Sequence, residues 1–313
     1  IDYIIQDWGS APLRSLLDLL VRDHGDIRRI SGLGYKKDGV VVLNPPQRAF
    51  EIIKHSDIPY HLVDQNLPSY TRFNSEAVII PLFTSLGCPY QCSFCIAPGQ
   101  YSKVKGKKWI PLDVTEVLDH IQLLVDRYDV RELQVYDDDS FVDMERMRAF
   151  FRGYIDRGFH RRIMLDFRGV RVDEVDRMDD HLLSMMVEAN VNMLFIGLES
   201  GSDAVLKKLK KGITREQILR VNRKLGRYPR RKPRYSYFCG VPGETSADLM
   251  LTTSPRRPVV RGHPVCHLGA GSDFKPIPSS ELSDVQVKQH GPTPAHPPAP
   301  CIASDPSRPA TIH

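Results

Sequence analysis

Short apolar segments alternate with amphipathic segments through the central part of the chain. Five apolar segments have the length and composition of strands: 77–84, 132–136, 163–167, 193–197 and 235–239. Between them, apolar residues recur at the spacing of a helix that buries one face. Strands that alternate with such helices are typical of parallel βα units. The pattern therefore predicts an α/β fold built on a parallel sheet.

Local signals at the helix ends agree with this alternation. Two pairs of residues have the spacing of capping boxes: Asp113 with Glu116, and Thr214 with Gln217. Asn190 and Gly212 stand where a left-handed residue is expected after a helix. A complete barrel of eight units takes about 250 residues, but the repeats here occupy only about 170. We therefore expect a shorter, open barrel of roughly six units.

The beginning of the chain contains one predicted strand and one predicted helix. Residues 2–5 predict a short strand, and residues 12–21 predict a helix with leucines at 13, 16, 17 and 20 on one face. Residues 32–64, with a hairpin-like turn at 36–39, predict a connector that has little core of its own.

The composition changes after Leu251. Twelve of the 24 prolines lie in the last 63 residues, so we expect the far tail, 291–313, to be disordered. Segment 272–278 predicts only a weak sixth strand, which would leave the fifth strand with an unpaired edge. Because the helical pattern is lost over 255–267, we hypothesise that the chain is a fragment or a locally frame-shifted product.

Three of the six cysteines lie within eight residues, at Cys88, Cys92 and Cys95. Three such thiolates can ligate an iron–sulfur cluster and leave one iron open. A structural zinc knuckle and three unrelated buried thiols are the alternatives, although no histidine stands at ligand spacing from this loop. Clustered cysteines indicate a reducing compartment. With no apolar run long enough to span a membrane and no signal peptide, the sequence predicts a cytoplasmic protein.

The formal net charge of +5 equals the charge of one basic run. Its members are Arg227, Arg230, Arg231, Lys232 and Arg234, with Tyr228 and Tyr235 beside them. A basic loop with tyrosines can bind RNA or a phosphate, but an isolated charge run is more often a solvated loop.

Candidate chemistry follows the predicted strands. In a βα barrel the active site forms at the carboxyl ends of the strands. Four polar or glycine-rich segments begin there: 88–95, 137–139, 197–202 and 240–244. We expect these segments to converge on a single cofactor pocket.

The same segments resemble a known family. Cys-x3-Cys-x2-Cys, with Phe94 before the last cysteine, is similar to the cluster loop of radical S-adenosylmethionine (SAM) enzymes. The similarity extends to 84–90, the acidic run near Phe141, and segments 171–173, 196–202 and 240–244. Together they resemble the branch with an N-terminal cobalamin (B12)-binding domain, which includes the anaerobic magnesium-protoporphyrin monomethyl ester cyclases.

This resemblance implies a domain organisation. Residues 77–250 would form a partial (βα)6-type radical SAM barrel, preceded by the remnant of a Rossmann-like cobalamin-binding domain over 1–30 and a linker over 31–76. Residues 251–290 would be a degraded sixth unit, followed by a proline-rich tail. The Asp-x-His-x-x-Gly signature of many cobalamin proteins is missing, so cobalamin is expected only in a full-length parent.

The resemblance also implies the cofactors and the residues that hold them. Cys88, Cys92 and Cys95 would ligate a [4Fe-4S] cluster whose fourth iron is chelated by SAM. The SAM site would be lined by Phe94, Asp138, Arg171, Glu199, Ser200, Gly240 and Pro242.

Several of these residues have a second interpretation. Glu199 accepts a cofactor hydroxyl or ammonium, or it is a helix-start carboxylate. Arg171 pairs with the SAM carboxylate or with the acidic residues that follow it. One aspartate of 137–139 accepts a hydrogen bond from the SAM ammonium, and the sequence does not fix which of the neighbouring positions does so. The other two aspartates are expected to be solvated. The bend at 240–243 packs against adenine or is a plain turn.

We therefore predict a radical SAM enzyme that cleaves SAM to a 5′-deoxyadenosyl radical. Its substrate would be a small molecule such as a tetrapyrrole or another secondary metabolite. Its partner would be a one-electron reductant such as flavodoxin or ferredoxin, with no membrane and no nucleic acid involved. An RNA-modifying radical methylthiotransferase-like enzyme, favoured only by the basic run, and a non-catalytic metal-binding fragment are the alternatives.

Overall fold

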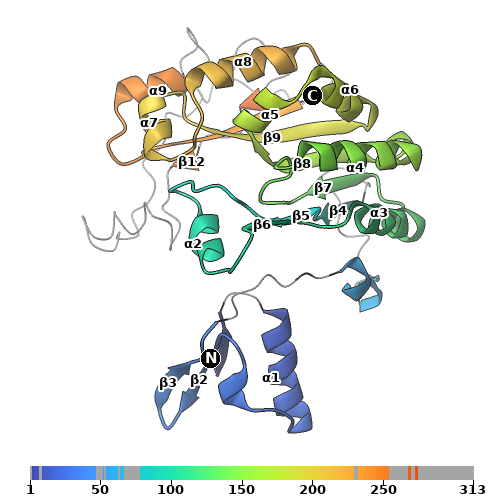
Figure 1. Ribbon diagram of the computed structural model, residues 1–313, viewed down its shortest axis with the longest axis vertical. Helices are drawn as coiled ribbons and strands as arrows, with labels where there is room; N and C mark the ends of the chain where they lie inside the picture. Colours follow the sequence, from blue (N-terminus) through green and yellow to red (C-terminus); the bar gives the residue numbers. More distant parts are fainter. Residues whose placement is uncertain are drawn as a thin grey trace, which may run out of the picture.

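The chain forms a small N-terminal unit and a larger α/β unit that begins at β4 (Figure 1). The computed structural model describes residues 2–6, 9–46, 52, 54–62, 64–66, 78–228, 232–253, 267–268 and 272–273. The predicted tail and most of the stretch behind the frame-shift hypothesis lie outside the described residues. The candidate site is built on the larger unit.

A parallel sheet is the frame of the larger unit. Its strands are β4 (Ile79–Leu82), β7 (Glu132–Val135), β8 (Met164–Arg171), β9 (Val191–Glu199) and β10 (Lys232–Cys239), and they lie side by side in this order. Each neighbouring pair in this series is parallel. The predicted α/β fold with a parallel sheet is confirmed.

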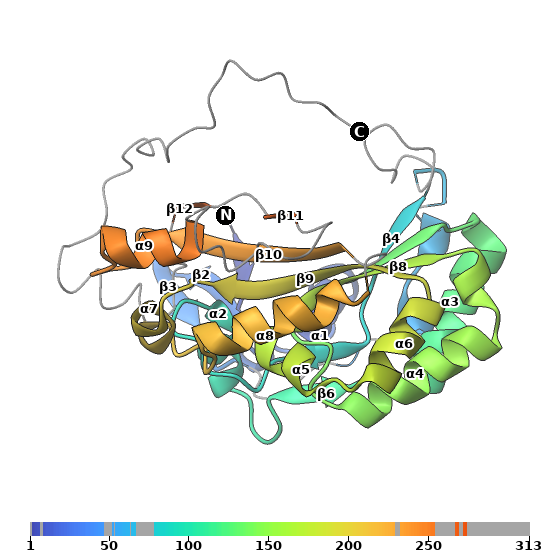
Figure 2. The ribbon, with the colours of Figure 1, turned by 90° about the horizontal axis from the view of Figure 1, so that it is seen from above.

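Helices cover one face of this sheet (Figure 2). They are α3 (Val114–Tyr128), α4 (Met144–Asp156), α5 (Val172–Arg177), α6 (Asp180–Glu188) and α8 (Arg215–Gly226). Because side chains alternate along a strand, every second residue faces these helices. The residues that do so are apolar and fully buried, among them Leu133, Val135, Leu165, Phe167 and Ile196.

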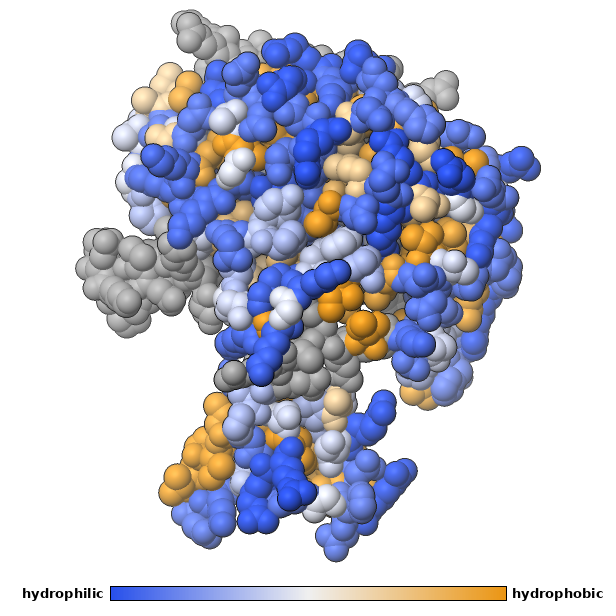
Figure 3. Space-filling view, viewed as in Figure 1, coloured by the Kyte–Doolittle hydropathy of each residue, from blue (hydrophilic) through white to orange (hydrophobic). Residues whose placement is uncertain are grey.

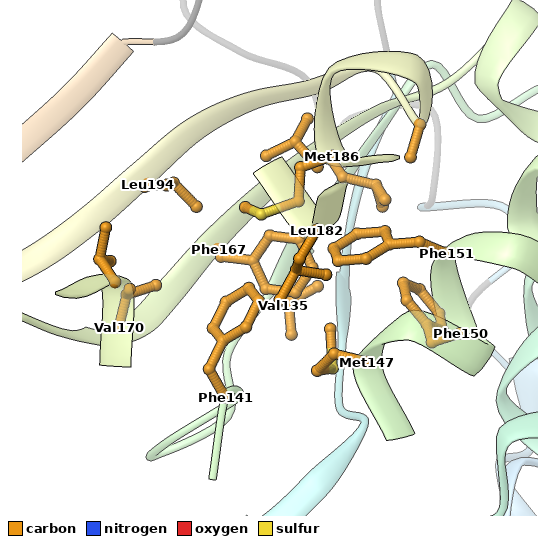
Figure 4. Close-up of a cluster of buried hydrophobic side chains, with 14 of the residues drawn as sticks. Val135, Phe141, Met147, Phe150, Phe151, Phe167, Val170, Leu182, Met186 and Leu194 are labelled. Atoms are coloured by element: carbon orange, nitrogen blue, oxygen red, sulfur yellow. The ribbon is translucent and has the colours of Figure 1, made fainter. Parts of the chain in front are cut away.

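Aromatic rings fill the layer between the sheet and α4 (Figure 4). The ring centroid of Phe167 on β8 lies 5.1 Å from that of Phe141 and 5.8 Å from that of Phe151. Phe150 packs on Phe151 from the same helix. Burying one such side chain stabilises the fold by about 1.5–3 kcal/mol, so this layer fixes the acidic loop before α4 against β8.

The remaining elements of the larger unit surround the ends of the strands. Helices α2 (Ile96–Ser102), α7 (Asp203–Lys208) and α9 (Ser246–Thr253) follow β5, β9 and β10. Strands β5 (Ser85–Gly87) and β6 (Trp109–Pro111) form an antiparallel ribbon. The short 3-10 helix η5 (Phe159–Arg161) also belongs to this unit, whereas η1 (Ile27–Arg29), η2 (His55–Asp57) and η3 (Tyr60–Leu62) precede β4.

The predicted helix boundaries have physical causes that the structure shows. Thr214 and Gln217 cap each other's backbone at the start of α8. Asp113 accepts the amide of Glu116 at the start of α3. Asn190 follows α6 with a φ of 57°, the left-handed conformation that ends a helix. Local side-chain hydrogen bonds therefore place these ends, as the sequence predicts.

Two predicted strands differ from the observed ones. Segment 77–84 gives only β4, because the chain then leaves the sheet and enters the β5–β6 ribbon that leads to the cysteines. The edge of β10 is not left bare: β11 (His267–Leu268) and β12 (Ser272–Asp273) pair with it in parallel. The expectation of an unpaired fifth strand is therefore wrong for these positions.

The N-terminal unit has its own sheet and core. Strands β1 (Tyr3–Ile5), β2 (Leu33–Lys37) and β3 (Val40–Leu43) are antiparallel, and the β2–β3 turn is the one predicted at 36–39. Leu16 of α1 (Ser10–Arg22) packs with Leu33 and Tyr35. The first part of the predicted connector, 32–64, therefore contributes to a core.

Apolar residues remain on the surface of this unit. The predicted leucine face of α1 buries Leu16, whereas Leu13, Leu17 and Leu20 are exposed, because the three-stranded sheet covers only a narrow stripe of the helix. On β3, Val40 and Val41 are also exposed, and Figure 3 shows apolar surface over this strand. In the part of the chain that the structure describes, no helix combines the length and apolarity that crossing a bilayer requires.

We predict that acid weakens the packing of the segment before β4 on α3. His120 is hydrogen-bonded to the Tyr60 hydroxyl at 2.6 Å, and burial lowers the pKa of His120 to about 4. Between the ordinary histidine pKa of about 6.5 and about 4, the unfolded chain binds more protons, so stability falls as the pH falls. The melting temperature should drop between pH 7.5 and pH 5, and the drop should be smaller in His120→Gln. An equal drop in the variant would contradict this assignment.

Candidate active site at the carboxyl ends of the strands

The cysteine loop runs from the end of β5 to the start of α2. Cys92 is buried, and Cys88 and Cys95 are half-buried. Cys95 caps α2, since its Sγ accepts a hydrogen bond from the amide of Ala97 at 3.4 Å. Burial raises the pKa of Cys88 to about 12 and also raises that of Cys95. The thiols of Cys88 and Cys95 are therefore protonated at neutral pH, and a metal that binds them displaces their protons.

Arg171, at the end of β8, ties the cysteine loop to the sheet. Its Nη1 donates to Cys92 Sγ at 3.5 Å, and its guanidinium lies 3.6 Å from the centre of the Tyr90 ring. Its Nε donates to Asp173 at 2.9 Å, and its Nη2 donates to the carbonyl of Lys211 at 2.5 Å. The expected pairing with a following acidic residue is present, together with a contact to the cysteine loop.

A buried ion pair lies behind the cysteine loop. Lys211 Nζ is 2.8 Å from Glu199 Oε1, and both side chains are buried. Burial opposes the charge on Lys211, but Glu199 and Cys92 together outweigh burial, and the pKa of Lys211 is raised. Gly197 leaves room for this pair, since a Cβ there would lie 2.5 Å from Glu199 Oε1. Glu199 is not a helix-start carboxylate, because Ser202 is the N-cap of α7.

Asp137, the first of three consecutive aspartates, is a structural residue. It accepts hydrogen bonds from the amide and the hydroxyl of Thr84 at 2.7 and 2.5 Å, and from the hydroxyl of Ser85 at 2.9 Å. Gly169 allows the backbone of Asp137 to approach β8, since a Cβ there would lie 2.2 Å from the Asp137 carbonyl. These contacts fasten the beginning of β5 to the end of β7, and thereby position the cysteine loop.

Asp138 is the exposed member of the run. It accepts a hydrogen bond from the hydroxyl of Tyr101 on α2 at 2.5 Å. It also lies near enough to Cys95 to oppose loss of the thiol proton. The expectation that two of the three aspartates are solvated is wrong, because Asp137 and Asp139 are buried.

Asp139 and Glu174 form a buried pair of carboxyl groups that are 1% and 0% exposed. Burial raises the pKa of Glu174 to about 10 and that of Asp139 to about 6. Asp139 Oδ2 and Glu174 Oε1 are buried without a hydrogen-bond partner among the described residues, and the negative charge of Asp139 also helps to raise the pKa of Glu174. The other oxygen of Glu174 accepts the amide of Arg171 at 3.2 Å. The pair therefore supports the backbone of the arginine that contacts Cys92.

Two further predicted cofactor residues have internal partners. Phe94 packs edge-on against Phe238 of β10, with ring centroids 5.1 Å apart. Ser200 is fully buried, accepts the amide of Ser202 at 3.2 Å and lies 3.4 Å from the hydroxyl of Thr252 on α9. Phe94 thus joins the cysteine loop to β10, whereas the Ser200 hydroxyl joins the end of β9 to α9.

The bend after β10 is open to solvent on one side. Gly240 and Gly243 have φ values of 86° and 71°, a conformation that disfavours other residues. Lys208 of α7 donates to the carbonyls of Pro242 and Gly243 at 3.1 and 3.0 Å. Lys208 therefore holds the bend beside α7 while Gly240 and Pro242 stay exposed.

The structure brings most of the predicted segments to one end of the sheet. Direct contacts link the cysteine loop to β8 through Arg171, to α7 and β9 through Lys211, and to β10 through Phe94. Within the described ranges, no three His, Cys, Asp or Glu side chains converge on a point that could hold a single metal ion. In an iron–sulfur cluster each thiolate binds a different iron, and the thiols need not meet at one point.

Sequence reasoning missed the two lysines of this site. Lys208 and Lys211 follow one another closely in the segment Lys-Lys-Leu-Lys-Lys-Gly at the end of α7, which resembles an ordinary solvated charge run. The signal that distinguishes Lys211 is Gly212 directly after it, with a φ of 73°, which turns the chain back toward the sheet. Only the fold shows that Glu199 is its partner.

Comparison with known proteins agrees with this geometry. The family model described as the radical SAM superfamily matches residues 82–253, which is more than half of the chain. The chain belongs to the radical SAM superfamily. Its members are enzymes, and the match supports a [4Fe-4S] cluster and SAM as the cofactors of the site.

The curated relatives of this radical SAM chain are named for different reactions. An uncharacterised methyltransferase of Pyrococcus horikoshii is 25% identical over 256 residues, covering 80% of this chain and 52% of the relative. The anaerobic magnesium-protoporphyrin IX monomethyl ester cyclase of Synechocystis is 23% identical and covers 68% of this chain and 40% of the relative. The cytidylyl-2-hydroxyethylphosphonate methyltransferase of Streptomyces wedmorensis is 30% identical, with shares of 55% and 31%. The chain thus spans about half or less of these relatives.

Solved structures share the fold. One is the cobalamin-dependent radical SAM enzyme OxsB with aqua-cobalamin and SAM bound. The superposition covers 91% of this chain and 45% of the OxsB chain, with a TM-score of 0.63 and 19% sequence identity. Another is the radical SAM methyltransferase TsrM of Kitasatospora setae with cobalamin and a [4Fe-4S] cluster bound. That superposition covers 79% of this chain and 47% of the TsrM chain, with a TM-score of 0.59 and 17% sequence identity. At these identities the likeness concerns the fold.

We predict that replacing one member of the Lys211–Glu199 ion pair lowers the free energy of unfolding more than replacing both. Lys211→Met leaves the Glu199 carboxylate buried without a partner, which should lower the free energy of unfolding by about 3–5 kcal/mol. Adding Glu199→Gln to this variant should recover much of the loss. Chemical denaturation of the single and double variants measures both values, and an equal loss in the two would contradict the assignment.

We predict unequal roles for two neighbouring aspartates. Asp137→Ala removes three hydrogen bonds and leaves the Thr84 amide without its partner, which should cost about 2–4 kcal/mol of stability. Asp138→Ala, the matched control, removes one contact at an exposed position and should cost about 1 kcal/mol or less. Thermal melting of both variants compares them. A larger loss for Asp138→Ala would refute the structural role of Asp137.

Proposed function

We propose that this chain is the cluster- and SAM-binding core of a radical SAM enzyme that acts on a small molecule. The observation that carries the proposal is the position of the cysteine loop, which is held at the carboxyl ends of the strands by Arg171 and closed from behind by Lys211 and Glu199. When bound, the cluster and SAM supply a 5′-deoxyadenosyl radical after transfer of one electron.

The residues of the loop fit a cluster. Cys88, Cys92 and Cys95 are the proposed ligands, and each sulfur has a favourable neighbour. The amide of Ala97 donates to Cys95, a backbone hydrogen bond at Tyr90 favours the thiolate of Cys88, and Arg171 donates to Cys92. Hydrogen bonds to the sulfurs and cations beside them are features by which proteins stabilise iron–sulfur clusters.

Three roles are proposed for the residues around the cluster. Asp138 is the candidate for the SAM ammonium, because it is the exposed aspartate of the run and lies beside the cysteine loop. Gly240 and Pro242 form an exposed bend that can approach the adenine closely. Arg171 is assigned a positioning role, because its guanidinium already contacts Tyr90, Cys92 and Asp173.

Glu199, Ser200 and Phe94 support the site from inside. Glu199 keeps a second oxygen that lies 3.4 Å from the Ser236 hydroxyl and faces the strands, so it is the candidate acceptor for a cofactor hydroxyl. Phe94 and the Ser200 hydroxyl pack within the protein and are proposed to hold the walls of the pocket.

Cobalamin is proposed only for a full-length parent of this chain. The relatives that bind cobalamin are longer than this chain, and the described N-terminal unit offers an antiparallel sheet without the histidine signature. We derive no step through cobalamin. A one-electron reductant such as flavodoxin or ferredoxin is the proposed partner.

The basic run does not favour an RNA-modifying enzyme. Arg227 ends α8 and pairs with Asp180 at 2.9 Å, and Tyr235 is fully buried in the core. Arg234 lies within β10 and not in a loop. The described members of the run are therefore divided between a helix end and a strand, the neighbouring Tyr235 belongs to the core, and 229–231 lie outside the described residues.

Anaerobic reconstitution of the full chain with iron and sulfide tests the proposal. We expect a brown protein with about four irons per chain and, after reduction with SAM present, formation of 5′-deoxyadenosine. Cys92→Ala should lose the cluster, and Cys239→Ala, which removes a cysteine of β10 outside the loop, should keep it. Stoichiometric zinc with no iron, or equal loss in both variants, would support the non-catalytic alternative.

A further inference from the structure

We propose that the face of the sheet opposite the helices binds a planar anion, an aromatic ring that carries carboxylate or phosphate groups. The ligand would be held by Arg168 and Arg234 and by the aromatic side chains beside them. The inference rests on the proposed function, because it names the substrate class for the same site.

Five residues form one row across this face. Phe83, Tyr136, Arg168, Phe195 and Arg234 come from, or directly follow, the five neighbouring strands β4, β7, β8, β9 and β10. Arg234 and Phe195 are register partners. The residues that precede Phe83, Tyr136, Arg168 and Phe195 are also register partners of one another. The row therefore lies at one level of the sheet.

The row points away from the helices. The neighbours that precede its first four members are buried under the helices: Leu82, Val135, Phe167 and Leu194. Because successive strand residues face opposite sides, the row occupies the other face, which Figure 2 shows free of helices α3 to α8. Phe83 and Tyr136 are 49% and 47% exposed. Large apolar rings exposed side by side are typical of ligand-binding surfaces.

Arg168 lies at the centre of the row and has no acidic partner. Its guanidinium carbon lies 5.6 Å from the centre of the Tyr136 ring and 5.9 Å from that of the Phe195 ring. Its Nη2 donates to the amide oxygen of Gln134 at 3.1 Å, and its Nε is buried with no hydrogen-bond partner. Among the described side chains no carboxylate pairs with it or with Arg234.

The acidic residues of this face are already satisfied. Glu132 accepts a hydrogen bond from Gln134 at 2.9 Å, and Asp166 accepts one from Asn192 at 2.9 Å. Both lie nearer the amino ends of the strands than the row does. Among the side chains that the structure describes, the level of the row therefore carries two cations and no anion, which leaves a positive charge on an aromatic surface.

These properties select a planar anion. A partly buried guanidinium without a counter-charge is costly, and an anionic ligand offsets that cost. The guanidinium fork matches carboxylate and phosphate oxygens, and exposed phenyl rings favour a flat ring stacked against them. A neutral ligand would not pair with the arginine charge, and an aliphatic ligand would not stack on the aromatic rings.

Isothermal titration of the full chain with isophthalate, at low salt and without cluster or SAM, tests the inference. We expect isophthalate to bind and Arg168→Gln to weaken binding roughly tenfold or more, since a hydrogen bond to a charged group is lost. Arg234→Gln, at an exposed position, should weaken it as well. The matched control is Arg220→Gln on α8, which breaks an exposed ion pair with Asp176 on the other side of the sheet and should leave binding unchanged.

Three results would overturn the inference: equal binding of the neutral isophthalamide, equal binding of inorganic phosphate and isophthalate, or unchanged affinity in Arg168→Gln and Arg234→Gln while circular dichroism shows both folded. Absence of binding by the unaltered chain would overturn it too. The measurement needs no iron, so its failure is distinct from a failure of cluster assembly, and a chain without a cluster can still pass it.

Discussion

The guanidinium of Arg171 joins three segments that lie far apart in the sequence. It stacks on Tyr90 and donates to Cys92 in the cysteine loop, and it donates to the carbonyl of Lys211 beyond α7. Its own backbone belongs to β8 and is held by Glu174. Ordering the cysteine loop, which has seven or eight residues, is opposed by a large loss of conformational entropy. The contacts of the Arg171 guanidinium offset part of that loss. The position of the cysteines relative to the sheet depends on it.

Buried charged groups also position the other residues around the cysteine loop. Lys211 and Glu199 are paired beside the loop, and burial raises the pKa of the Asp139 and Glu174 carboxyl groups. Each arrangement is sensitive to the removal of one member, because an unpaired charge in a dry site is destabilising by several kcal/mol.

The sequence was most informative where local rules decide the structure. Capping at Thr214, the left-handed Asn190 and the alternation of strands and helices are short-range properties, and they match the structure. The cysteine spacing likewise pointed to the family that the comparison supports.

Roles that depend on long-range contacts could not be predicted from the sequence. Asp137 differs from Asp138 only because Thr84 and Ser85, more than fifty positions earlier, approach it. Lys211 resembles a solvated lysine until β9 places Glu199 beside it. Arg234 looked like part of a basic loop, yet it continues β10, because the strand begins within the charge run. In each case a residue's partner is fixed by tertiary packing and not by spacing.

We propose that three thiolates, held by Arg171 and its neighbours, bind a four-iron cluster and leave one iron for SAM. Mössbauer spectroscopy of the chain reconstituted with isotopically enriched iron, recorded with and without SAM, tests it most directly. We predict that one iron in four changes its isomer shift when SAM is added, while the other three stay the same. A spectrum in which all the irons are unaffected by SAM, or one with no four-iron cluster, would contradict the account.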